Sequence, residues 1–275
     1  MRLENRVAII TGAGRGIGRD IALGFAKEGA RLVLAARTTT QLAETAKQAE
    51  ALGAPTLVIT ADISNQSQVE RMVKQTLEEF ETIDILINNA GIIGPMRTLE
   101  QTDPSDWIQT IQTNFIGTYL CCRAVLPVML QQNRGKIINM SGGGASGDVH
   151  KYLSAYSSSK AATLKLTEVM SLELADRNIQ VNTVEPGLFR TQMAEELIRG
   201  MGESGGSDYY KRYDKIFSGE GPLEQLLELA VFLGSEASGE LSGRVISTDD
   251  FSPEFQSKIP EIMASDAYKV RRVKP

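Results

Sequence analysis

The chain of 275 residues is poor in the side chains that hold metals or form disulfides. It contains a single histidine, His150, and two cysteines, Cys121 and Cys122, which are neighbours in the sequence. Adjacent cysteines in a helical pattern argue against a disulfide framework, and one histidine argues against Ser-His-Asp chemistry and most metal sites. We therefore predict no metal site, two buried thiols, and a histidine that is solvated on a loop.

Long apolar runs and a basic excess are missing as well. No apolar segment approaches the roughly 18 residues of a membrane-spanning helix, and the first residues lack the regions of a signal peptide. The net charge of −5 argues against nucleic acid and anionic membranes as partners. With 42% hydrophobic and 23% charged residues, the composition is that of a globular protein, which we expect in the cytoplasm.

Short apolar segments alternate with amphipathic helical segments along the chain. Buried strands are predicted at 7–10, 30–36, 56–61, 83–87, 136–140, 180–184 and 243–247. Helices are predicted at about 17–27, 40–52, 66–80, 154–177 and 223–233, with Ser64 as the cap of the third and Asp103 as the cap of another that begins at Pro104. This alternation predicts an α/β fold: a single doubly wound Rossmann-type domain over residues 1–250, with a parallel sheet covered by helices on both faces.

The first strand leads into a glycine-rich turn. The pattern Thr-Gly-x-x-x-Gly-x-Gly places Gly12, Gly16 and Gly18 between the strand and the helix. Glycines allow a tight turn, close approach of a ligand to the backbone, and close packing of the helix on the strand. The helix N-terminus would face the turn and favour a phosphate, so the pattern predicts a dinucleotide pyrophosphate site. An ordinary glycine-rich turn is the alternative.

Tyr156 and Lys160 lie four residues apart in the long predicted helix and therefore share one of its faces. A free tyrosine has a pKa of about 10, so it is a poor acid or base at neutral pH unless a cation stabilises the phenolate. Lys160 can be that cation, although an isolated pair of this kind is more often a surface contact.

Taken together, the motifs resemble the classical short-chain dehydrogenase/reductase family over most of the chain. The motifs occur in the same order as in that family. They are the glycine turn, Asn88-Asn89-Ala90-Gly91 after the fourth strand, Asn114, Tyr156 with Lys160, and Pro186-Gly187. The resemblance implies that a hydride is exchanged between a nicotinamide cofactor and a carbonyl or carbinol carbon.

The resemblance also implies roles for individual residues. Tyr156 would be the general acid in reduction and the base in oxidation, Lys160 would lower its pKa and hold the nicotinamide ribose, and Asn114 would position a water in the proton relay. The residues implied in cofactor binding are Gly12, Arg15, Gly16, Ile17, Gly18, Arg37, Asp62, Ile63, Asn89, Ala90, Gly91, Tyr156, Lys160, Pro186, Gly187 and Thr191.

The serine that the family places after the fifth strand is missing. Alignment on the strand puts Gly142 at that position, and counting back from Tyr156 puts Gly143 there. Ser141 or Ser146 could supply the hydroxyl, or backbone N–H groups could act as donors; we predict Ser141. Loss of one such donor slows a reaction roughly 10²- to 10³-fold. The alternative function is that of a nucleotide-binding regulatory or scaffolding protein that has lost efficient catalysis.

Charge near the cofactor site favours NADP(H) over NAD(H). Ala36 stands where an NAD enzyme would carry an acidic residue that binds the ribose. Arg15 and Arg37 suit a 2′-phosphate, with solvated surface charge as the alternative. We therefore predict an NADP(H)-dependent oxidoreductase that acts on a ketone or secondary alcohol. The substrate stays open among a 3-oxoacyl thioester, a sugar or polyol, and a steroid-like ketone.

Two segments depart from the regular alternation. Residues 192–221 are amphipathic at first and then rich in glycine and tyrosine, which predicts a substrate lid, with a disordered loop as the alternative. Residues 251–275 form a tail that carries Phe255, Ile259 and Ile262. We hypothesise that the tail covers a neighbouring subunit, in a homodimer or homotetramer, or the active-site mouth; a frayed end is the alternative.

Overall fold

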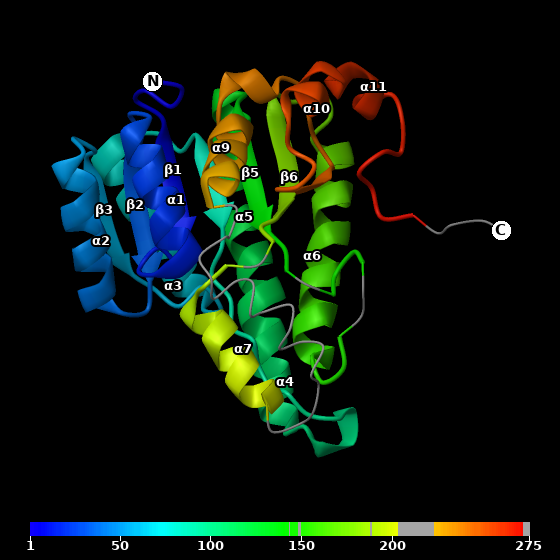
Figure 1. Cartoon of the computed structure of the whole chain (residues 1–275). Coiled ribbons are helices and arrows are strands. Elements are labelled where there is room, and N and C mark those ends of the chain that lie inside the picture. Colours follow the sequence, from blue (N-terminus) through cyan, green and yellow to red (C-terminus); the bar gives the residue numbers. More distant parts are fainter. Residues whose placement is uncertain (143, 148–149, 188, 203–222, 272–275) are drawn as a thin grey trace.

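The computed structural model describes residues 1–142, 144–147, 150–187, 189–202 and 223–271. Within these residues, seven parallel strands form one sheet in the order β3-β2-β1-β4-β5-β6-β7 (Figure 1). The strands are β1 (Val7–Thr11), β2 (Arg31–Ala36), β3 (Thr56–Thr60), β4 (Ile85–Asn88), β5 (Gly135–Met140), β6 (Ile179–Glu185) and β7 (Val245–Ser247). The predicted α/β fold with a doubly wound parallel sheet is confirmed.

Helices cover both faces of the sheet. One face carries α1 (Gly16–Lys27), α2 (Thr39–Ala51) and α9 (Leu223–Gly234), and the other carries α3 (Gln66–Phe80), α5 (Gly117–Gln132) and α6 (Ser154–Glu173). The other helices that the structure describes are α4 (Pro104–Ile111), α7 (Gln192–Gly202), α10 (Pro253–Ser257), α11 (Ile259–Met263), the π-helical turn η2 (Gln112–Ile116), and the 3-10 turns η1 (Leu99–Gln101) and η3 (Glu236–Ser238).

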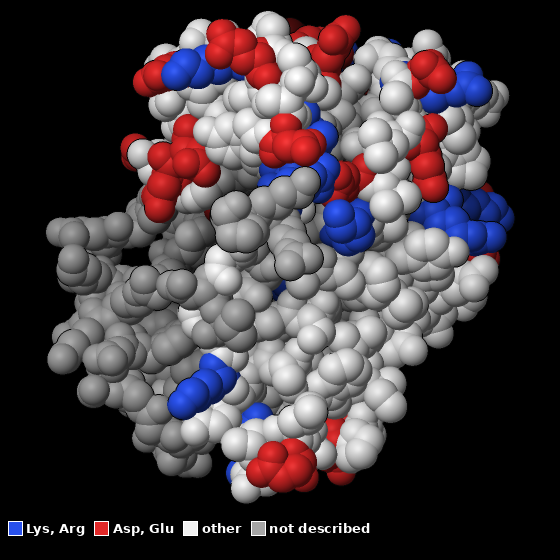
Figure 2. Space-filling model, turned by 90° about the vertical axis from the view of Figure 1, so that its right-hand side faces the viewer, with Lys and Arg blue, Asp and Glu red and all other residues white. Residues whose placement is uncertain are grey.

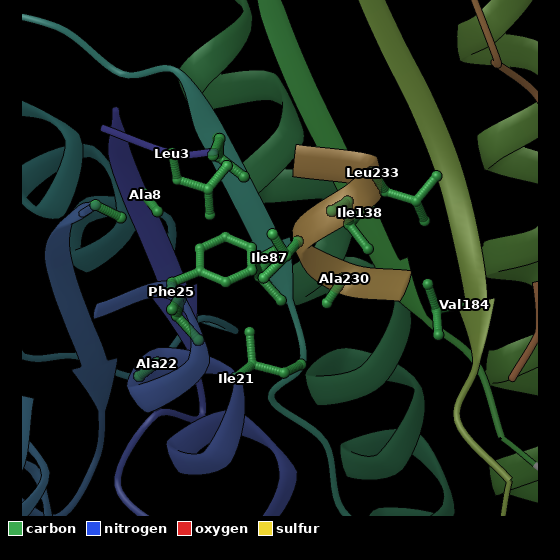
Figure 3. Packing of buried hydrophobic residues seen from close by; sticks show 14 of the residues in the cluster. Leu3, Ala8, Ile21, Ala22, Phe25, Ile87, Ile138, Val184, Ala230 and Leu233 are labelled. Atoms are coloured by element: carbon green, nitrogen blue, oxygen red, sulfur yellow. The ribbon is translucent and has the colours of Figure 1, made fainter. Parts of the chain in front are cut away.

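The hydrophobic core lies between the sheet and its helices. The strands β1 and β5 are buried over their whole length, as expected of strands that are covered on both faces. Figure 3 shows Phe25 of α1 beside Ile87 of β4, with Ala230 of α9 near Ile138 of β5. All four side chains are almost completely buried, which anchors α1 and the turn before it.

The strand order reverses between β1 and β4. From β1 the chain moves outward to β2 and β3 and then returns to β4 on the other side of β1. Open parallel sheets form a crevice outside the carboxyl ends of the strands at such a point. The glycine turn after β1 meets segment 89–91 after β4 there, because a Cβ on Gly12 would lie only 2.9 Å from Cα of Ala90.

The cap of α3 differs from the prediction. Asn65, not Ser64, caps this helix, because the Asn65 side chain accepts a hydrogen bond from Gln68 N at 3.1 Å. The Ser64 hydroxyl is engaged elsewhere, since it donates to Asp62 at 2.7 Å. At α4 the predicted cap is confirmed: the carboxylate of Asp103 accepts from the backbone of the first turn.

The long helix α6 is shorter than predicted. It ends at Glu173 instead of Arg177. The cause is the pairing of the next strand, since Asn178 O accepts a hydrogen bond from Gly135 N at 3.0 Å at the start of β5 and β6. The chain must leave the helix to reach that position.

The C-terminal tail packs on its own chain. Phe255 and Ile262 are buried, and the Phe255 ring centroid lies 5.1 Å from that of Tyr268. The buried Arg244 donates to the carbonyl oxygens of Ile262 at 2.8 Å and Met263 at 3.3 Å. In Figure 1, α10 and α11 lie at the end of the molecule opposite α7, and α7 flanks the crevice. Residues 251–271 therefore do not cover the active-site mouth of their own chain, which corrects that part of the hypothesis; contact with a neighbouring subunit stays a prediction.

Ion pairs accompany this docking. Arg271 pairs with Glu168 of α6, and Lys269 pairs with Asp266 at 3.0 Å. Figure 2 shows described side chains of both charges close together over the upper part of this side of the molecule and few over its middle. Exposed pairs contribute at most about 1 kcal/mol each, so apolar burial is the main contribution to tail docking.

One stretch of the described residues, Pro104–Gln132, is apolar and long enough to cross a membrane, with a mean hydropathy of 1.3. It comprises α4, η2 and α5, and α5 packs on the sheet with Cys121 and Cys122 buried. Core helices of globular proteins have the same length and composition, so the stretch is weak evidence for a membrane span. The predicted burial of both thiols is confirmed, and neither forms a disulfide.

Candidate active site

The glycine turn forms a cradle at the N-terminus of α1. Gly12 and Gly16 adopt positive φ angles of 67° and 54°, which favour glycine. A Cβ on Gly18 would collide with the carbonyl oxygen of Gly12. Arg15, the N-cap residue, makes no side-chain capping bond, and no acidic residue occupies the first turn of α1. The backbone N–H groups at this helix end are therefore available to an anion such as a pyrophosphate.

A cavity of about 830 Å³ runs along the carboxyl ends of the strands. Its size is typical of a ligand site. Most of the predicted site residues line it: Gly12, Arg15, Gly16, Ile17, Arg37, Asp62, Ile63, Asn89, Ala90, Gly91, Ser141, Tyr156, Lys160, Pro186, Gly187 and Thr191. Gly18 and Asn114 are buried directly behind its walls, where Gly18 faces Gly12 and Asn114 faces Gly91.

Thr11, the first residue of the Thr-Gly-x-x-x-Gly-x-Gly pattern and not one of the predicted site residues, connects the two sides of the crevice. Its hydroxyl donates to Ile87 O at 3.2 Å and accepts from the backbone N–H groups of Asn89 at 3.0 Å and Ala90 at 3.1 Å. The Asn89 side chain donates back to Thr11 O at 3.0 Å. These bonds hold segment 89–91 against the glycine turn. The sequence feature that could have indicated this role is the threonine directly before Gly12.

The ends of β2 and β3 form the other end of the cavity. Arg15 and Arg37 are exposed and both line it, and Ala36 brings no carboxylate to this wall. Arg19, one helical turn after Arg15, also lines the cavity and was not predicted. Asp62 lies at the end of β3, as predicted. Guanidinium groups therefore gather near the point where a dinucleotide ribose would lie in this fold.

Tyr156 and Lys160 lie together on α6, as their spacing predicts. The Lys160 ammonium nitrogen lies 5.8 Å from the centroid of the Tyr156 ring and donates to Met140 O at 2.8 Å. The Lys160 side chain is buried, and this burial lowers the pKa of Lys160 to about 8. At neutral pH the ammonium group still carries its proton, so it presents a positive charge beside the tyrosine.

Asn114 lies in the π-helical turn η2, a feature that is frequent at functional sites and was not predicted. Its side chain accepts from Ile92 N at 2.8 Å and donates to Ile92 O at 2.9 Å and to Ser159 Oγ at 3.1 Å. A Cβ on Gly91 would lie 3.2 Å from Asn114 Oδ1 and 3.7 Å from Lys160 Nζ. Asn114 and Lys160 therefore meet behind the same glycine.

The structure separates the two serines that could replace the missing one. Ser141 lines the cavity, and its hydroxyl oxygen is buried without a hydrogen-bond partner among the described residues. Ser146 is exposed, pairs with Glu185 and does not line the cavity. Gly142 lines the cavity beside Tyr156, whereas Gly143 lies outside the described residues.

Helix α7 forms the described part of the predicted lid. Thr191 Oγ1 accepts from Ala194 N at 3.1 Å at the start of this helix. Gln192 accepts a hydrogen bond from Arg15, so α7 contacts the glycine turn directly. Met193 and Leu197 of α7 line the cavity. Residues 203–221, which the lid prediction also includes, lie outside the described residues.

His150 lies in the cavity wall. Its side chain is half-buried and lines the cavity together with Leu153 and Tyr156. His150 lies on a loop, as predicted, but its side chain is half-buried instead of fully solvated, because the fold brings this loop over the N-terminal end of α6. Nothing in the local sequence indicates this position.

The strand order, the glycine cradle and the cavity define a Rossmann-type dinucleotide-binding protein. Residues 6–202 match the family described as short chain dehydrogenase. The chain therefore belongs to the short-chain dehydrogenase/reductase family, whose members are oxidoreductases that bind a nicotinamide cofactor and act on CH–OH or C=O groups. Among the described residues, no three metal-ligating side chains lie close enough to hold a metal ion.

Relatives are similar over nearly their whole length. The chain is 35% identical over 249 residues to the (2S)-[(R)-hydroxy(phenyl)methyl]succinyl-CoA dehydrogenase subunit BbsD of Thauera aromatica, covering 90% of this chain and 96% of the relative. It is 33% identical over 251 residues to the 3-oxoacyl-[acyl-carrier-protein] reductase FabG of Thermotoga maritima, covering 90% and 98%. Among solved structures, levodione reductase superposes with a TM-score of 0.82 at 27% identity, covering 90% of this chain and 98% of that one. NAD+-bound xylitol dehydrogenase superposes with a TM-score of 0.81 at 26% identity, with the same coverage.

Proposed function

We propose that the protein is an NADP(H)-dependent reductase of ketones that runs in reverse on secondary alcohols. The observation that carries this proposal is the pair of Tyr156 and buried Lys160 at the cavity, beside the glycine cradle. A protein that only bound the cofactor would not need a tyrosine paired with a lysine whose charge is buried, since burying a charge is costly.

The cavity residues fit a nicotinamide dinucleotide, because the glycines leave the helix N-terminus open and a Cβ on Gly18 would close the cradle. When bound, the nicotinamide supplies the hydride that reaches the carbonyl carbon. Tyr156 gives its proton to the carbonyl oxygen, so the ketone becomes a secondary alcohol. The positive charge of Lys160 would stabilise the phenolate that remains and so favour this transfer.

Asn114 and Ser141 support the reaction in this proposal. The Asn114 side chain is hydrogen-bonded to both backbone groups of Ile92 and lies next to Lys160. There it would position a water in the relay that returns a proton to Tyr156. The buried hydroxyl of Ser141 would donate to the substrate oxygen, in place of the serine hydroxyl that is missing at position 142.

Charge supports NADP(H) over NAD(H). Arg15 and Arg37 line the cavity near Ala36, which offers no carboxylate to a ribose 2′-hydroxyl group. A 2′-phosphate would pair with these guanidinium groups.

Among relatives, 3-oxoacyl-[acyl-carrier-protein] reductases make a 3-oxoacyl thioester a candidate substrate. We place the enzyme in the cytoplasm, with one catalytic domain over residues 1–250 and assembly into a homodimer or homotetramer.

The experiment is to follow NADPH absorbance with a panel of ketones and 3-oxoacyl thioesters. We expect turnover by the wild type and a loss of roughly 10²- to 10⁴-fold in Tyr156→Phe, with NADPH binding retained. Ser141→Ala should lose roughly 10²-fold in kcat if its hydroxyl serves the substrate oxygen. Ser158→Ala, which alters an exposed hydroxyl on the same helix as Tyr156, is the matched control. Tight NADPH binding without turnover of any substrate would support the regulatory or scaffolding alternative.

A further inference from the structure

The first residues of α7 lie against the glycine turn. A Cβ on Gly16 would lie 3.5 Å from Cγ2 of Thr191, and Arg15 donates a hydrogen bond from Nη1 to Oε1 of Gln192. All four residues line the cavity. The contact therefore joins the cofactor cradle to the first residue of a helix that lies 177 positions further along the chain.

The side chain of Gln192 is fixed by a second hydrogen bond. Its Nε2 donates to Oε1 of Glu196, one turn later in α7, at 2.9 Å. Because the amide nitrogen is engaged there, the amide presents its oxygen to Arg15. The start of the helix is held as well, since Thr191 Oγ1 accepts from Ala194 N at 3.1 Å. Gln192 thus offers a fixed acceptor to an arginine whose side chain is exposed.

The partner of Arg15 is a neutral amide, so it orients the guanidinium group without neutralising its charge. A guanidinium group has five N–H donors in a planar fork. The bond to Gln192 uses Nη1 and leaves the edge formed by Nε and Nη2, which can pair two donors with two phosphate oxygens. A carboxylate in place of the amide would instead pair with Arg15 and compete with the phosphate.

Orientation of Arg15 matters because its side chain is long and exposed. A free arginine samples many rotamers, and a ligand that fixes it must overcome this loss of freedom. A side chain that is already restrained loses less on binding, so the affinity for the ligand rises. In the proposed function NADPH needs Arg15 for its 2′-phosphate, whereas NADH lacks this phosphate.

We infer that Gln192 is a positioning residue for cofactor specificity, which holds the guanidinium group of Arg15 where the 2′-phosphate of NADP(H) binds. The inference rests on the proposed function, which assigns that phosphate to Arg15 and Arg37. Because Gln192 belongs to α7, the same contact links the phosphate to the helix that carries Met193 and Leu197 into the cavity wall. Such a link is reciprocal, so NADPH stabilises α7 more than NADH does.

The experiment measures the Kd of NADPH and of NADH by isothermal titration in a double-mutant cycle. Gln192→Met keeps the length of the side chain and removes the acceptor. We expect it to raise the Kd for NADPH about fivefold and the Kd for NADH by about twofold at most. In an Arg15→Ala background, Gln192→Met should change neither Kd, since Gln192 acts through Arg15. Gln256→Met, the same substitution at an exposed residue of the tail, is the matched control.

Hydrogen exchange of α7 gives a second readout that needs no turnover. In the wild type, saturating NADPH should slow the exchange of residues 192–202 more than saturating NADH does. Gln192→Met should remove this difference, because the helix is then no longer bonded to Arg15. Equal protection of α7 by the two cofactors in the wild type would overturn the link between the phosphate and the helix.

The outcomes separate the inference from the proposed function. An unchanged NADPH affinity in Gln192→Met, equal losses for both cofactors, or additive losses in the double variant would overturn the inference. A preference of the wild type for NADPH would leave the proposed function intact in each of these cases. Equal affinity of the wild type for NADPH and NADH would overturn the NADP(H) assignment and the inference with it.

Discussion

The hydroxyl end of Tyr156 lies against the α-carbon of Gly142, in the space that a side chain at position 142 would occupy. A Cβ there would lie 2.9 Å from Cζ of Tyr156 and closer still to its hydroxyl oxygen. At the position where the family carries a serine, the hydroxyl end of Tyr156 occupies the space of the absent side chain. Gly142 therefore controls the placement of the tyrosine hydroxyl.

Gly142→Ala is expected to slow the reaction without unfolding the protein. The added methyl group displaces the tyrosine hydroxyl, and a displacement of about 1 Å can cost roughly 10²-fold in rate. The far end of the ring can shift, so the free energy of unfolding should change by less than about 1 kcal/mol. NADPH kinetics and urea unfolding measure the two effects. Gly147→Ala is the control because no atom of the described residues outside its immediate chain neighbours lies within 4 Å of a Cβ built at Gly147. An unchanged kcat in Gly142→Ala would contradict this account.

Lys160→Met is expected to abolish a rise in stability between pH 8 and pH 10.5. Burial lowers the pKa of Lys160 from 10.5 in the unfolded chain to about 8. Below pH 8 both states are protonated and the folded state carries the full cost of the buried charge. As pH rises from 8 toward 10.5 the folded state loses this proton first, so the cost disappears and stability rises, by at most about 3 kcal/mol.

The measurement is urea unfolding of wild type and Lys160→Met at pH 7.5 and pH 10. The difference between the two proteins isolates Lys160 from other titrating groups, including Lys136, whose pKa burial also lowers to about 8. The variant should lack the rise in the wild-type curve and lose roughly 10²- to 10⁴-fold in turnover. Parallel curves for the two proteins would show that the lysine does not titrate in this range.

Removing Arg15 or Arg37 is expected to weaken NADPH selectively. Each guanidinium group would form a charge-assisted hydrogen bond with the 2′-phosphate, so either alanine variant should raise the Kd for NADPH about tenfold. The Kd for NADH, which lacks this phosphate, should change little. Isothermal titration with both cofactors decides the question. Arg31→Ala, at the start of β2 and so at the opposite end of that strand, is the control. Equal losses for both cofactors would argue against a 2′-phosphate site.

Phe255→Ala is expected to destabilise the protein and leave its kinetics intact. The Phe255 side chain is buried against Tyr268, and truncation of a buried phenylalanine costs about 3–5 kcal/mol. The tail lies away from the cavity, so KM and kcat at low temperature should match the wild type. Calorimetry measures the loss of stability, and NADPH kinetics measure KM and kcat. Lys258→Ala, at an exposed residue of the tail, is the control. Altered kinetics in the folded variant would indicate that the tail reaches the site of another subunit.

Much of the fold could be predicted because strands covered on both faces must be uniformly apolar. Segments such as 7–10 and 136–140 are recognisable for that reason, and their alternation with helices implies the parallel sheet. Helix ends were less predictable, since Asn65 and Ser64 are both good caps and only the bond from Ser64 to Asp62 decides between them. The π-helical turn at Asn114 has no comparable pattern in the sequence.

The sequence by itself determined the order of the motifs and the residue types that they bring to the carboxyl ends of the strands. These follow from local spacing: three glycines in one turn, or Tyr156 and Lys160 four residues apart on one helix face. Only the tertiary structure decided that Ser141 lines the cavity and Ser146 does not, that His150 lines the cavity, and that the tail packs on its own chain. Each of these depends on contacts between segments far apart in the sequence, which local patterns do not encode.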